Sequence, residues 1–532
     1  MMVHPKLQKK QQVRRPFGAA VTYFCCGGRS NILSCFAVIS LAVSMILFLP
    51  WKFAKDVITN QSAPSVSQLP PWKEGYLDIH HIHAGVNVAT FLIFPDGTTM
   101  LIDCGDLDIA KFNQKYGKAT ALYPKLDVVS PYPNQSKTTG QWVIDYIHHF
   151  WPNTADPAAT PNYSNTNGDN TNNIRRVIDI MMITHFHQDH IGSIYTADQH
   201  EQKKGTRGDY IRTGIVEVGD DIDFTTIIDR GYPKYDFPFD LEQDWESAPF
   251  LNYLNFVRTS LQRGSTKTVE QFQVGNYTQI GLRNVAQGTT TGSSPFGHFR
   301  IRNIKANLEY SYATPEDHEV KTIPGKLLHP APKRKSGYTY DENKVSAAIV
   351  IEYGNFRYYE GGDQEYHNDG YPSELPDEDG SQKYELDTVT PTAQMAGPVH
   401  VATLNHHGHG VLKAFCDILN PKVLILQGWC TDQPPNHSME TLLQHQQDKP
   451  ADLFTTWISE ERLDGLRQQK KSLRNMFKST VGHVVVRVEP LLSNNNNNQN
   501  ENDDEIDQEQ KYHVYILDGN RHVNKYFGPY DA

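Results

Sequence analysis

Several mostly apolar stretches of this chain end directly in histidine or aspartate, and this recurring pattern restricts the fold more than any other feature. IRRVIDIMMIT, residues 174–184, runs straight into HFHQDH at 185–190. LIDCGD, YYEGGD and VATLNHHGHG end in the same way. Stretches of this length and composition are typical of buried strands. The sequence therefore predicts a strand-rich fold that carries potential metal ligands at its strand ends.

Length and charge set the outer limits. At 532 residues the chain exceeds one ordinary core, so one large decorated domain or two domains plus tails are expected. The 50 Lys and Arg residues against 61 Asp and Glu residues give a net charge of -11. No long basic block interleaved with aromatic residues follows the N-terminal tail. This charge balance argues against binding of a nucleic-acid backbone by bulk electrostatics.

Turn signals and hydrophobic periodicity predict the main elements. Apolar and polar residues alternate on both sides of Pro95-Asp96-Gly97, a turn signal. This pattern indicates a β-hairpin that ends near Asp103. His80, His81 and His83 lie in the preceding strand with no acidic partner at ligand spacing, so we interpret them as ordinary strand residues. The remaining predictions are helices at Gln141–Trp151, Phe250–Leu261 and Ser459–Lys478, and strands within 174–184, 345–364, 399–410, 422–429, 482–489 and, as the closing strand, 511–518.

The N-terminus predicts a membrane anchor. Ile32–Pro50 is uncharged and long enough to cross a bilayer as a helix. Six cationic residues precede it, whereas only Lys52 and Lys55 follow closely, so the positive-inside rule keeps the tail in the cytoplasm. A cleaved signal peptide is the alternative. The predicted organisation is a basic cytoplasmic tail at 1–31, a transmembrane signal anchor at 32–50, a linker at 51–75 and a folded domain at 76–532 with a disordered acidic insert near 493–510.

This topology predicts an extracellular or lumenal catalytic domain on a single-pass membrane protein. Five N-x-S/T sequons permit glycosylation on that side, at Asn60, Asn134, Asn162, Asn276 and Asn436. Beyond the apolar segment three cysteines remain, Cys104, Cys416 and Cys430, so at most one disulfide is possible among them.

HFHQDH has the chemistry of a metal site. In an extended segment His185, His187 and Asp189 share one side, and a turn at Asp189 brings His190 back to them. Imidazole and carboxylate suit zinc and related divalent ions, and Gly192 permits a tight backbone after the turn. The alternative is a polar loop whose histidines cap a helix. Asp363, His406, His407 and His437 supply further potential ligands, mostly at other strand ends.

The pattern H-x-H-x-D-H resembles the metallo-β-lactamase superfamily. LIDCGD matches that family's first motif at Asp103, and GGD matches its metal-bridging aspartate at Asp363. NHHG followed by a later histidine is most similar to the β-lactamase-like domain of competence-type DNA-uptake channels and to phosphorylcholine esterases. The resemblance covers roughly residues 77–518. It implies an α+β fold, a four-layer αβ/βα sandwich with two metal ions in the cleft between its sheets.

The resemblance also implies a role for each ligand. His185, His187 and His407 would hold one ion, Asp189, His190 and His437 the other, and Asp363 would bridge them. His406 would face the substrate, with exchanged roles of His406 and His407 as the alternative. Asp103 would brace the metal loop, and His409 would lie outside the site. Zinc is the expected metal, with manganese or iron as alternatives.

The expected activity is hydrolysis by a metal-activated hydroxide that Asp189 orients, with His406 donating to the developing negative charge. The NHHG subtype favours a phosphodiester or another small ester that carries a phosphate. No glycine-flanked histidine between His190 and Asp363 matches lactonases and glyoxalases, and one predicted span does not make a DNA channel. The alternatives are a nuclease of the same fold and a catalytically silent, metal-binding membrane protein.

Overall fold

The computed structural model divides the chain into two compact units, Met1–Ser65 and Val66–Ala532. The structure describes residues 68–118, 125–152, 176–195, 202–245, 247–283, 296, 299–312, 321–324, 342–366, 374–376, 383–385, 387–469, 476–491 and 510–532. The predicted tail, the span Ile32–Pro50 and nearly all of the predicted acidic insert lie outside these ranges. Within the described ranges, none of the helices combines the length and apolar character that crossing a bilayer requires.

Two large sheets form the centre of the second unit. The first has the order β19-β18-β17-β1-β2-β3-β4-β5-β6. Its strands are β1 Leu77–His81, β2 Thr90–Ile93, β3 Thr99–Ile102, β4 Val177–Met182, β5 Asp223–Asp229, β6 Thr268–Gln271, β17 His483–Val488, β18 Lys511–Leu517 and β19 Val523–Asp531. The pairs from β3 to β6 are parallel, so the carboxyl ends of β3, β4 and β5 lie at one edge.

The second sheet has the order β16-β15-β14-β11-β10-β7-β8-β9. Its strands are β7 Phe299–Ala306, β8 Glu309–Tyr312, β9 Lys321–Pro324, β10 Ala348–Tyr353, β11 Phe356–Glu360, β14 Val401–Thr403, β15 Val423–Leu426 and β16 Asp452–Thr455, and a separate pair joins β12 Glu374–Pro376 to β13 Lys383–Glu385. β11, β14, β15 and β16 pair in parallel, so this sheet also gathers its carboxyl ends at one edge.

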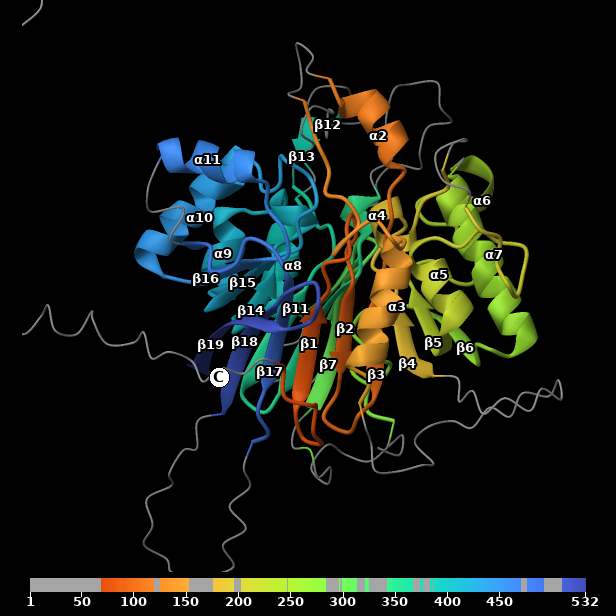
Figure 1. The fold of residues 1–532 in the computed structure, drawn as a ribbon, viewed down its shortest axis with the longest axis horizontal. Coiled ribbons are helices and arrows are strands. Elements are labelled where there is room, and N and C mark those ends of the chain that lie inside the picture. The colour runs from red at the N-terminus through yellow and green to blue at the C-terminus, as the bar shows by residue number, and fades with distance from the viewer. Residues whose placement is uncertain are drawn as a thin grey trace, which may run out of the picture. The chain divides into compact units, whose positions relative to one another are not determined.

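Helices cover the outer face of each sheet (Figure 1). Residues of both sheets share one core cluster, which includes Ile79, Leu92, Ile301 and Ile349. A second cluster packs α3, α5 and α7 on the first sheet, and a third packs α8, α9 and α10 on the second. The helices are α2 Ile109–Tyr116, α3 Thr139–His149, α4 Gln188–Ile191, α5 Gly214–Asp221, α6 Leu241–Asp244, α7 Ala248–Arg263, α8 Val389–Ala396, α9 Lys413–Leu419, α10 Asn436–Asp448 and α11 Glu460–Gln469, with single 3-10 turns η3 Asn343–Val345 and η4 His406–Gly408.

The predicted α+β class is confirmed, and the two helix-covered sheets are consistent with a metallo-β-lactamase sandwich. Local signals placed most elements correctly. β2 and β3 form the predicted hairpin, with Gly97 at φ +82° in its turn. The predicted helix at 141–151 is α3, which begins with a capping box between Thr138 and Gln141. The predicted helix at 250–261 is α7, which Ser247 caps.

Two predictions of element boundaries were wrong. The strand at 511–518 does not close its sheet, because β19 pairs with β18 and forms the edge. The charged helix predicted at Ser459–Lys478 extends too far at its C-terminal end. α11 spans Glu460–Gln469, residues 470–475 lie outside the described ranges, and Phe477 forms a bridge with Leu453 while its side chain packs in the core of the second sheet.

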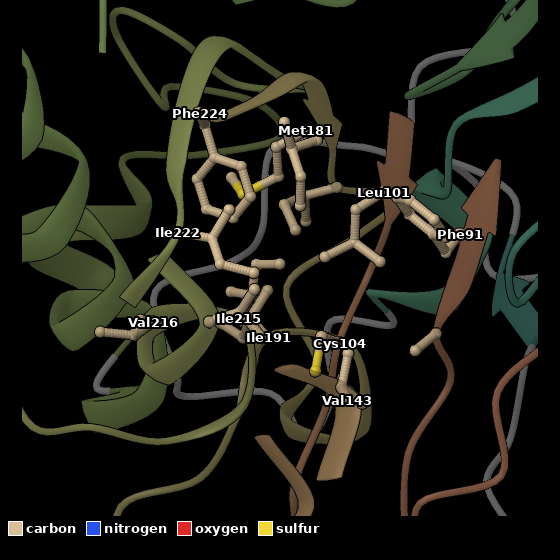
Figure 2. Close-up of a cluster of buried hydrophobic side chains, with 14 of the residues drawn as sticks. Phe91, Leu101, Cys104, Val143, Met181, Ile191, Ile215, Val216, Ile222 and Phe224 are labelled. Carbon is tan, nitrogen blue, oxygen red and sulfur yellow. The ribbon is translucent and has the colours of Figure 1, made fainter. Parts of the chain in front are cut away.

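The core under the first sheet also supports the segments that carry the predicted ligands. Figure 2 shows Cys104 and Ile191 among the buried side chains of the cluster that packs α3 and α5 on this sheet. Cys104 follows Asp103 at the end of β3, and Ile191 follows His190 at the end of α4. Cys104, Cys416 and Cys430 are buried free thiols. The ligand segments are therefore fixed by packing on the side away from the ligands.

Candidate metal centre

The HFHQDH segment leaves the end of β4 and turns at once into α4 (Figure 1). Cys104 N–H donates to the His190 carbonyl at 2.9 Å, and Asp106 N–H donates to the Gln188 carbonyl at 3.0 Å. Between them, a Cβ on Gly105 would lie 1.7 Å from the Asp189 carbonyl oxygen. Only glycine permits this approach. The backbone after β3 is therefore clamped to the backbone that carries Asp189 and His190.

Four buried side chains converge at this edge: Asp189, His190, Asp363 and His407. Their ligand atoms all lie within 4.8 Å of one another. His407 Nε2 is 2.9 Å from Asp189 Oδ2 and 3.4 Å from Asp363 Oδ2. His190 Nε2 is 3.2 Å from Asp363 Oδ2 and 3.8 Å from Asp189 Oδ2. Two imidazoles and two carboxylates at these separations form a donor set that suits a divalent ion.

Asp103 orients His190. Asp103 Oδ2 accepts hydrogen bonds from His190 Nδ1 at 2.8 Å and from the Thr184 hydroxyl at 2.6 Å, and Oδ1 accepts from Thr184 N–H at 2.8 Å. With its proton on Nδ1, His190 presents Nε2 to Asp363 and Asp189. Asp103 was predicted to brace the metal loop, and its bonds to Thr184 and His190 are compatible with that role. A carboxylate behind a histidine in this way fixes the ring and its tautomer for metal binding.

His407 is oriented by the second sheet. Its Nδ1 donates to the Gln427 carbonyl at 2.9 Å, directly after β15. His406 and His407 have φ of +48° and +50°, a left-handed conformation that costs free energy in residues other than glycine. The structure holds this strained turn, η4, where it aims His407 Nε2 at Asp189. A backbone outlier of this kind supports a functional role for the turn.

His185 and His187 lie beside this group. His185 Nε2 is 3.2 Å from His187 Nδ1 and 3.8 Å from Asp363 Oδ2. His407 Nε2 lies closest to Asp189 and Asp363, with its ring fixed by the Gln427 carbonyl. The predicted grouping of His407 with His185 and His187 around one ion stays a prediction.

His437 was predicted as a ligand of the second ion, and the structure does not bring it into the four-residue group. α10 begins at Asn436, so His437 lies in its first turn. Its Nε2 faces the His409 carbonyl at 3.5 Å, and its ring lies 6.2 Å from that of Tyr366. His409, which was expected outside the site, has its Nε2 4.0 Å from Asp432 Oδ2. A ligand role of His437 at a second ion therefore stays a prediction.

His406 lies next to the group without joining it. Its Nε2 is 3.2 Å from Asn343 Nδ2, and its Nδ1 is 3.8 Å from Glu365 Oε2. Burial lowers the pKa of His406 to about 3, so the imidazole is neutral at physiological pH. A neutral imidazole can donate one hydrogen bond and accept one. Because the Asn343 amide nitrogen only donates, Nε2 of His406 accepts from it and the ring hydrogen lies on Nδ1, on the side of Glu365.

Sequence reasoning missed a supporting ion pair between β5 and η3. Glu342 Oε1 accepts from Phe186 N–H at 2.9 Å, in the peptide between His185 and His187. Arg230 is fully buried and donates to both oxygens of Glu342, at 2.8 and 2.6 Å. The pair therefore fixes the backbone of the metal loop from behind. Its partners are 112 residues apart, and neither stands in a motif, so the sequence carried no signal for it.

The electrostatics of the four-residue group fit a cation. Burial opposes charge on His190, but the Asp363 and Asp103 carboxylates outweigh it and hold its pKa well above the ordinary value. Burial is likewise outweighed at His407, whose pKa rises to about 10 beside Asp363 and Asp189. Despite its position 3.2 Å from Asp363, buried His190 Nε2 has no hydrogen-bond partner. The carboxylates of the group therefore favour a positive charge at this position, and His190 Nε2 points toward the place where a cation would lie.

Comparisons with known proteins leave the family open. No family model matches the sequence, and no curated protein matches it. Two solved structures that match are the CmlA β-hydroxylase E377D mutant, at 12% identity and a TM-score of 0.30, and CmlA, a diiron β-hydroxylase from Streptomyces venezuelae, at 11% and 0.29. Each alignment covers 72% of this chain and 53% of the other, so this chain spans about half the length of those proteins. Likeness at this level assigns neither an activity nor a metal.

Proposed function

We propose that this chain is a metal-dependent hydrolase of the metallo-β-lactamase type. The observation that carries the proposal is the buried group of Asp189, His190, Asp363 and His407, whose donor atoms lie within 4.8 Å of one another at an edge formed by strand ends. His185 offers one more imidazole nitrogen 3.8 Å from Asp363, and His187 lies beside His185, which supports a second ion next to the first. The H-x-H-x-D-H signature and the two-sheet fold support the same family.

Divalent ions held at this centre would lower the pKa of a water toward about 7 and neutralise negative charge on a phosphoryl oxygen. The protein's own side chains would orient the metal ligands, the water and the substrate. Asp103 and the Gln427 carbonyl hold His190 and His407 in the tautomers that leave each Nε2 free. The Asp189 carboxylate would accept a hydrogen bond from the attacking water and so orient it. We propose that His406, neutral and beside the group, donates to the oxygen that gains charge, which requires its ring to release the Asn343 amide that Nε2 accepts.

For the substrate we propose a phosphodiester or a related small ester that carries a phosphate. This class rests on the resemblance of the NHHG segment to phosphorylcholine esterases. The net charge of -11 speaks against a nuclease.

Metal content and hydrolysis test the proposal directly. Full-length protein, purified in detergent and loaded in turn with zinc, manganese or iron, should bind close to two ions by elemental analysis. It should also hydrolyse bis(p-nitrophenyl) phosphate. His522→Ala is a matched control, because His522 is an exposed histidine near the C-terminus. A wild-type protein that holds no metal after each loading would refute the proposal, and one that holds metal without hydrolysing the ester would support the silent metal-binding alternative.

Replacing each of the adjacent histidines by alanine tests their separate roles. His407→Ala should lower metal occupancy, because His407 Nε2 belongs to the four-residue group. His406→Ala should retain the metal and lose most turnover, because its ring contacts Asn343 and Glu365 instead. The reverse pattern would exchange the two roles.

We also propose that the enzyme is anchored by Ile32–Pro50 and faces the lumen or the exterior. The charge asymmetry around this segment supports the orientation. Of the sequons in the described ranges, Asn134 and Asn436 are exposed. Expression in a eukaryotic host should yield a protein that peptide N-glycosidase shortens. A cytoplasmic C-terminal tag together with unmodified sequons would contradict this topology.

A further inference from the structure

Hydrogen bonds outside the metal centre join Glu489, His513 and Tyr526 on the first sheet. Glu489 directly follows β17, His513 lies in β18 and Tyr526 lies in β19. These strands are neighbours at one end of the sheet (Figure 1). His513 Nε2 is 2.9 Å from Glu489 Oε1, and His513 Nδ1 is 2.7 Å from the Tyr526 hydroxyl. A hydroxyl, an imidazole and a carboxylate thus stand in the order that an activated hydroxyl nucleophile requires.

The strand registers place the three side chains on one face of the sheet. His513 pairs with Arg487, which stands two residues before Glu489. Tyr515, two residues after His513, pairs with Tyr526. Side chains two residues apart in a strand share a face, so Glu489 and Tyr526 are diagonal neighbours of His513. The arrangement therefore follows from the backbone pairing of three strands and does not depend on a loop.

A β-bulge shapes the side of His513 that meets Tyr526. The register of β18 and β19 shifts here, so that Gly528 and Pro529 together oppose His513. Gly528 has a φ of +118°, and a Cβ at this position would lie 3.2 Å from His513 Nδ1. Glycine at the bulge therefore leaves room for the imidazole nitrogen that contacts the Tyr526 hydroxyl.

The hydrogen bonds also determine which nitrogen of His513 can act as a base. The Glu489 carboxylate only accepts, so His513 Nε2 carries the ring hydrogen, and Nδ1 of the neutral ring accepts from the Tyr526 hydroxyl. Burial and the nearby Glu489 raise the pKa of Tyr526, so the phenol keeps its proton at neutral pH and needs a base in order to attack. The side chain of His513 is 11% exposed, and Tyr526 is partly exposed. The pair is therefore accessible from solvent.

We propose that Tyr526 is a nucleophile that accepts an acyl group from an activated ester, with His513 as its general base and Glu489 as the positioning residue that orients the base. The Tyr526 oxygen forms a bond to the carbonyl carbon while its proton passes to His513 Nδ1. The bond from that carbon to the leaving oxygen then breaks, and the leaving group takes the proton. The products are an acyl-tyrosine and a free alcohol or phenol. The negative charge of Glu489 favours a neutral acyl donor over a phosphate.

Acetylation of the full-length protein by p-nitrophenyl acetate tests this proposal. A chelator is present throughout, because the step needs no metal and is independent of the proposed function. Peptide mass spectrometry should show acetylation of Tyr526 about 10-fold faster, or more, than that of Tyr530. Tyr530 is the matched reference, since it lies in the same strand, is also partly exposed and donates to Asp452 Oδ2 at 2.7 Å. The burst of p-nitrophenol should disappear in Tyr526→Phe and persist in Tyr530→Phe.

Variants of the base and its carboxylate separate catalysis from packing. His513→Gln should lower the rate at Tyr526 to that at Tyr530, whereas His522→Ala, which removes an exposed histidine, should leave it unchanged. Glu489→Gln should slow the reaction by a smaller factor, and Glu489→Asp should restore part of the rate because it retains the charge. Equal rates at the two tyrosines of the wild type would overturn the proposal. An unchanged rate at Tyr526 in His513→Gln, with its fold verified by circular dichroism, would do the same.

Discussion

Two of the described regions are rich in buried histidines, and only one of them combines these histidines with carboxylates in a donor set that could hold a metal ion. His80 and His81 lie in β1, His83 follows them, and His483 begins β17 beside them. In this β1 cluster the rings pack on aromatic side chains: His83 stacks on Tyr132 at 4.3 Å, and the other three also contact aromatic rings. No ligand group of the described residues includes these histidines.

The difference lies in the carboxylates. Burial lowers the pKa of His81 and of His83 to about 3, and nothing opposes it. The nearest carboxylate, Asp78, is 3.6 Å from His80 Nε2 but is committed to Arg487 through hydrogen bonds of 2.7 and 2.6 Å. At the metal group, Asp363 raises the pKa of His190 and of His407 against burial. Convergent carboxylates, and not the number of histidines, distinguish a cation site from a packed core.

The largest effect is expected from Asp363→Ala. Asp363 is within 4 Å of His185, His190 and His407, so its removal affects every part of the donor group. We expect loss of most bound metal and hydrolysis reduced to background, measured by elemental analysis and by release of p-nitrophenol. A His81→Ala variant from the β1 cluster should retain its metal. Full metal occupancy in Asp363→Ala would remove Asp363 from the centre.

The local elements were predictable, whereas the partners of the site were not. The turn at Pro95–Gly97 and the capping of α3 each depend on a few adjacent residues, so the hairpin and the helix could be predicted from the sequence alone. The roles of His407 and His437 depend on where the Gln427 carbonyl and the first turn of α10 lie relative to β4. A resemblance transfers ligand types in chain order, and it does not specify which sheet edge orients each ring. Arg230 and Glu342 stood in no motif.

Asp78→Asn should produce the largest loss of stability in the β1 cluster. The variant leaves Arg487 with a buried, unpaired charge, and breaking a buried pair in this way costs about 3–5 kcal/mol. Chemical denaturation should show this loss, while metal affinity stays at the wild-type value. Exchange of both partners, Asp78→Asn with Arg487→Met, should recover part of the stability. Reduced metal affinity in Asp78→Asn would mean that the two regions are coupled.

The same pair predicts a pH dependence. Burial raises the pKa of Asp78, but the neighbouring Arg487 lowers it by more, so the pKa is about 2, below its usual 3.8. A lowered carboxyl pKa stabilises the folded state above about pH 4, and this contribution is lost as the pH falls through about 2. The difference corresponds to about 2 kcal/mol. Between pH 4 and pH 2, Asp78→Asn should therefore lose less stability than the wild type, as measured by urea denaturation.

Asp103→Asn should weaken the metal centre by an intermediate amount. The carboxylate holds His190 through Nδ1 and is fixed by two bonds from Thr184, so the amide would disturb the ring without removing a ligand. Loss of such a partner typically costs 10–100-fold in metal affinity, about 1.4–2.7 kcal/mol. Competition with a chromophoric chelator should measure the decrease. An affinity equal to that of Asp127→Asn, an exposed control carboxylate, would contradict the bracing role.

The smallest effect at neutral pH is expected from His83→Phe. His83 is buried on Tyr132, its Nε2 has no hydrogen-bond partner, and a phenyl ring preserves the stacking, so stability at pH 7 should change by less than about 1.5 kcal/mol. The pH dependence is the sharper readout. A histidine whose pKa falls from 6.5 to about 3 on folding contributes stability that is present above about pH 6.5 and lost as the pH falls toward 3. Between pH 7 and pH 5 the wild type should therefore lose about 2 kcal/mol that His83→Phe does not lose. Thermal or urea denaturation at the two pH values would show it. Equal losses in both proteins would mean that His83 is protonated in the folded state, and the contrast between the β1 cluster and the metal group would then fail at this residue.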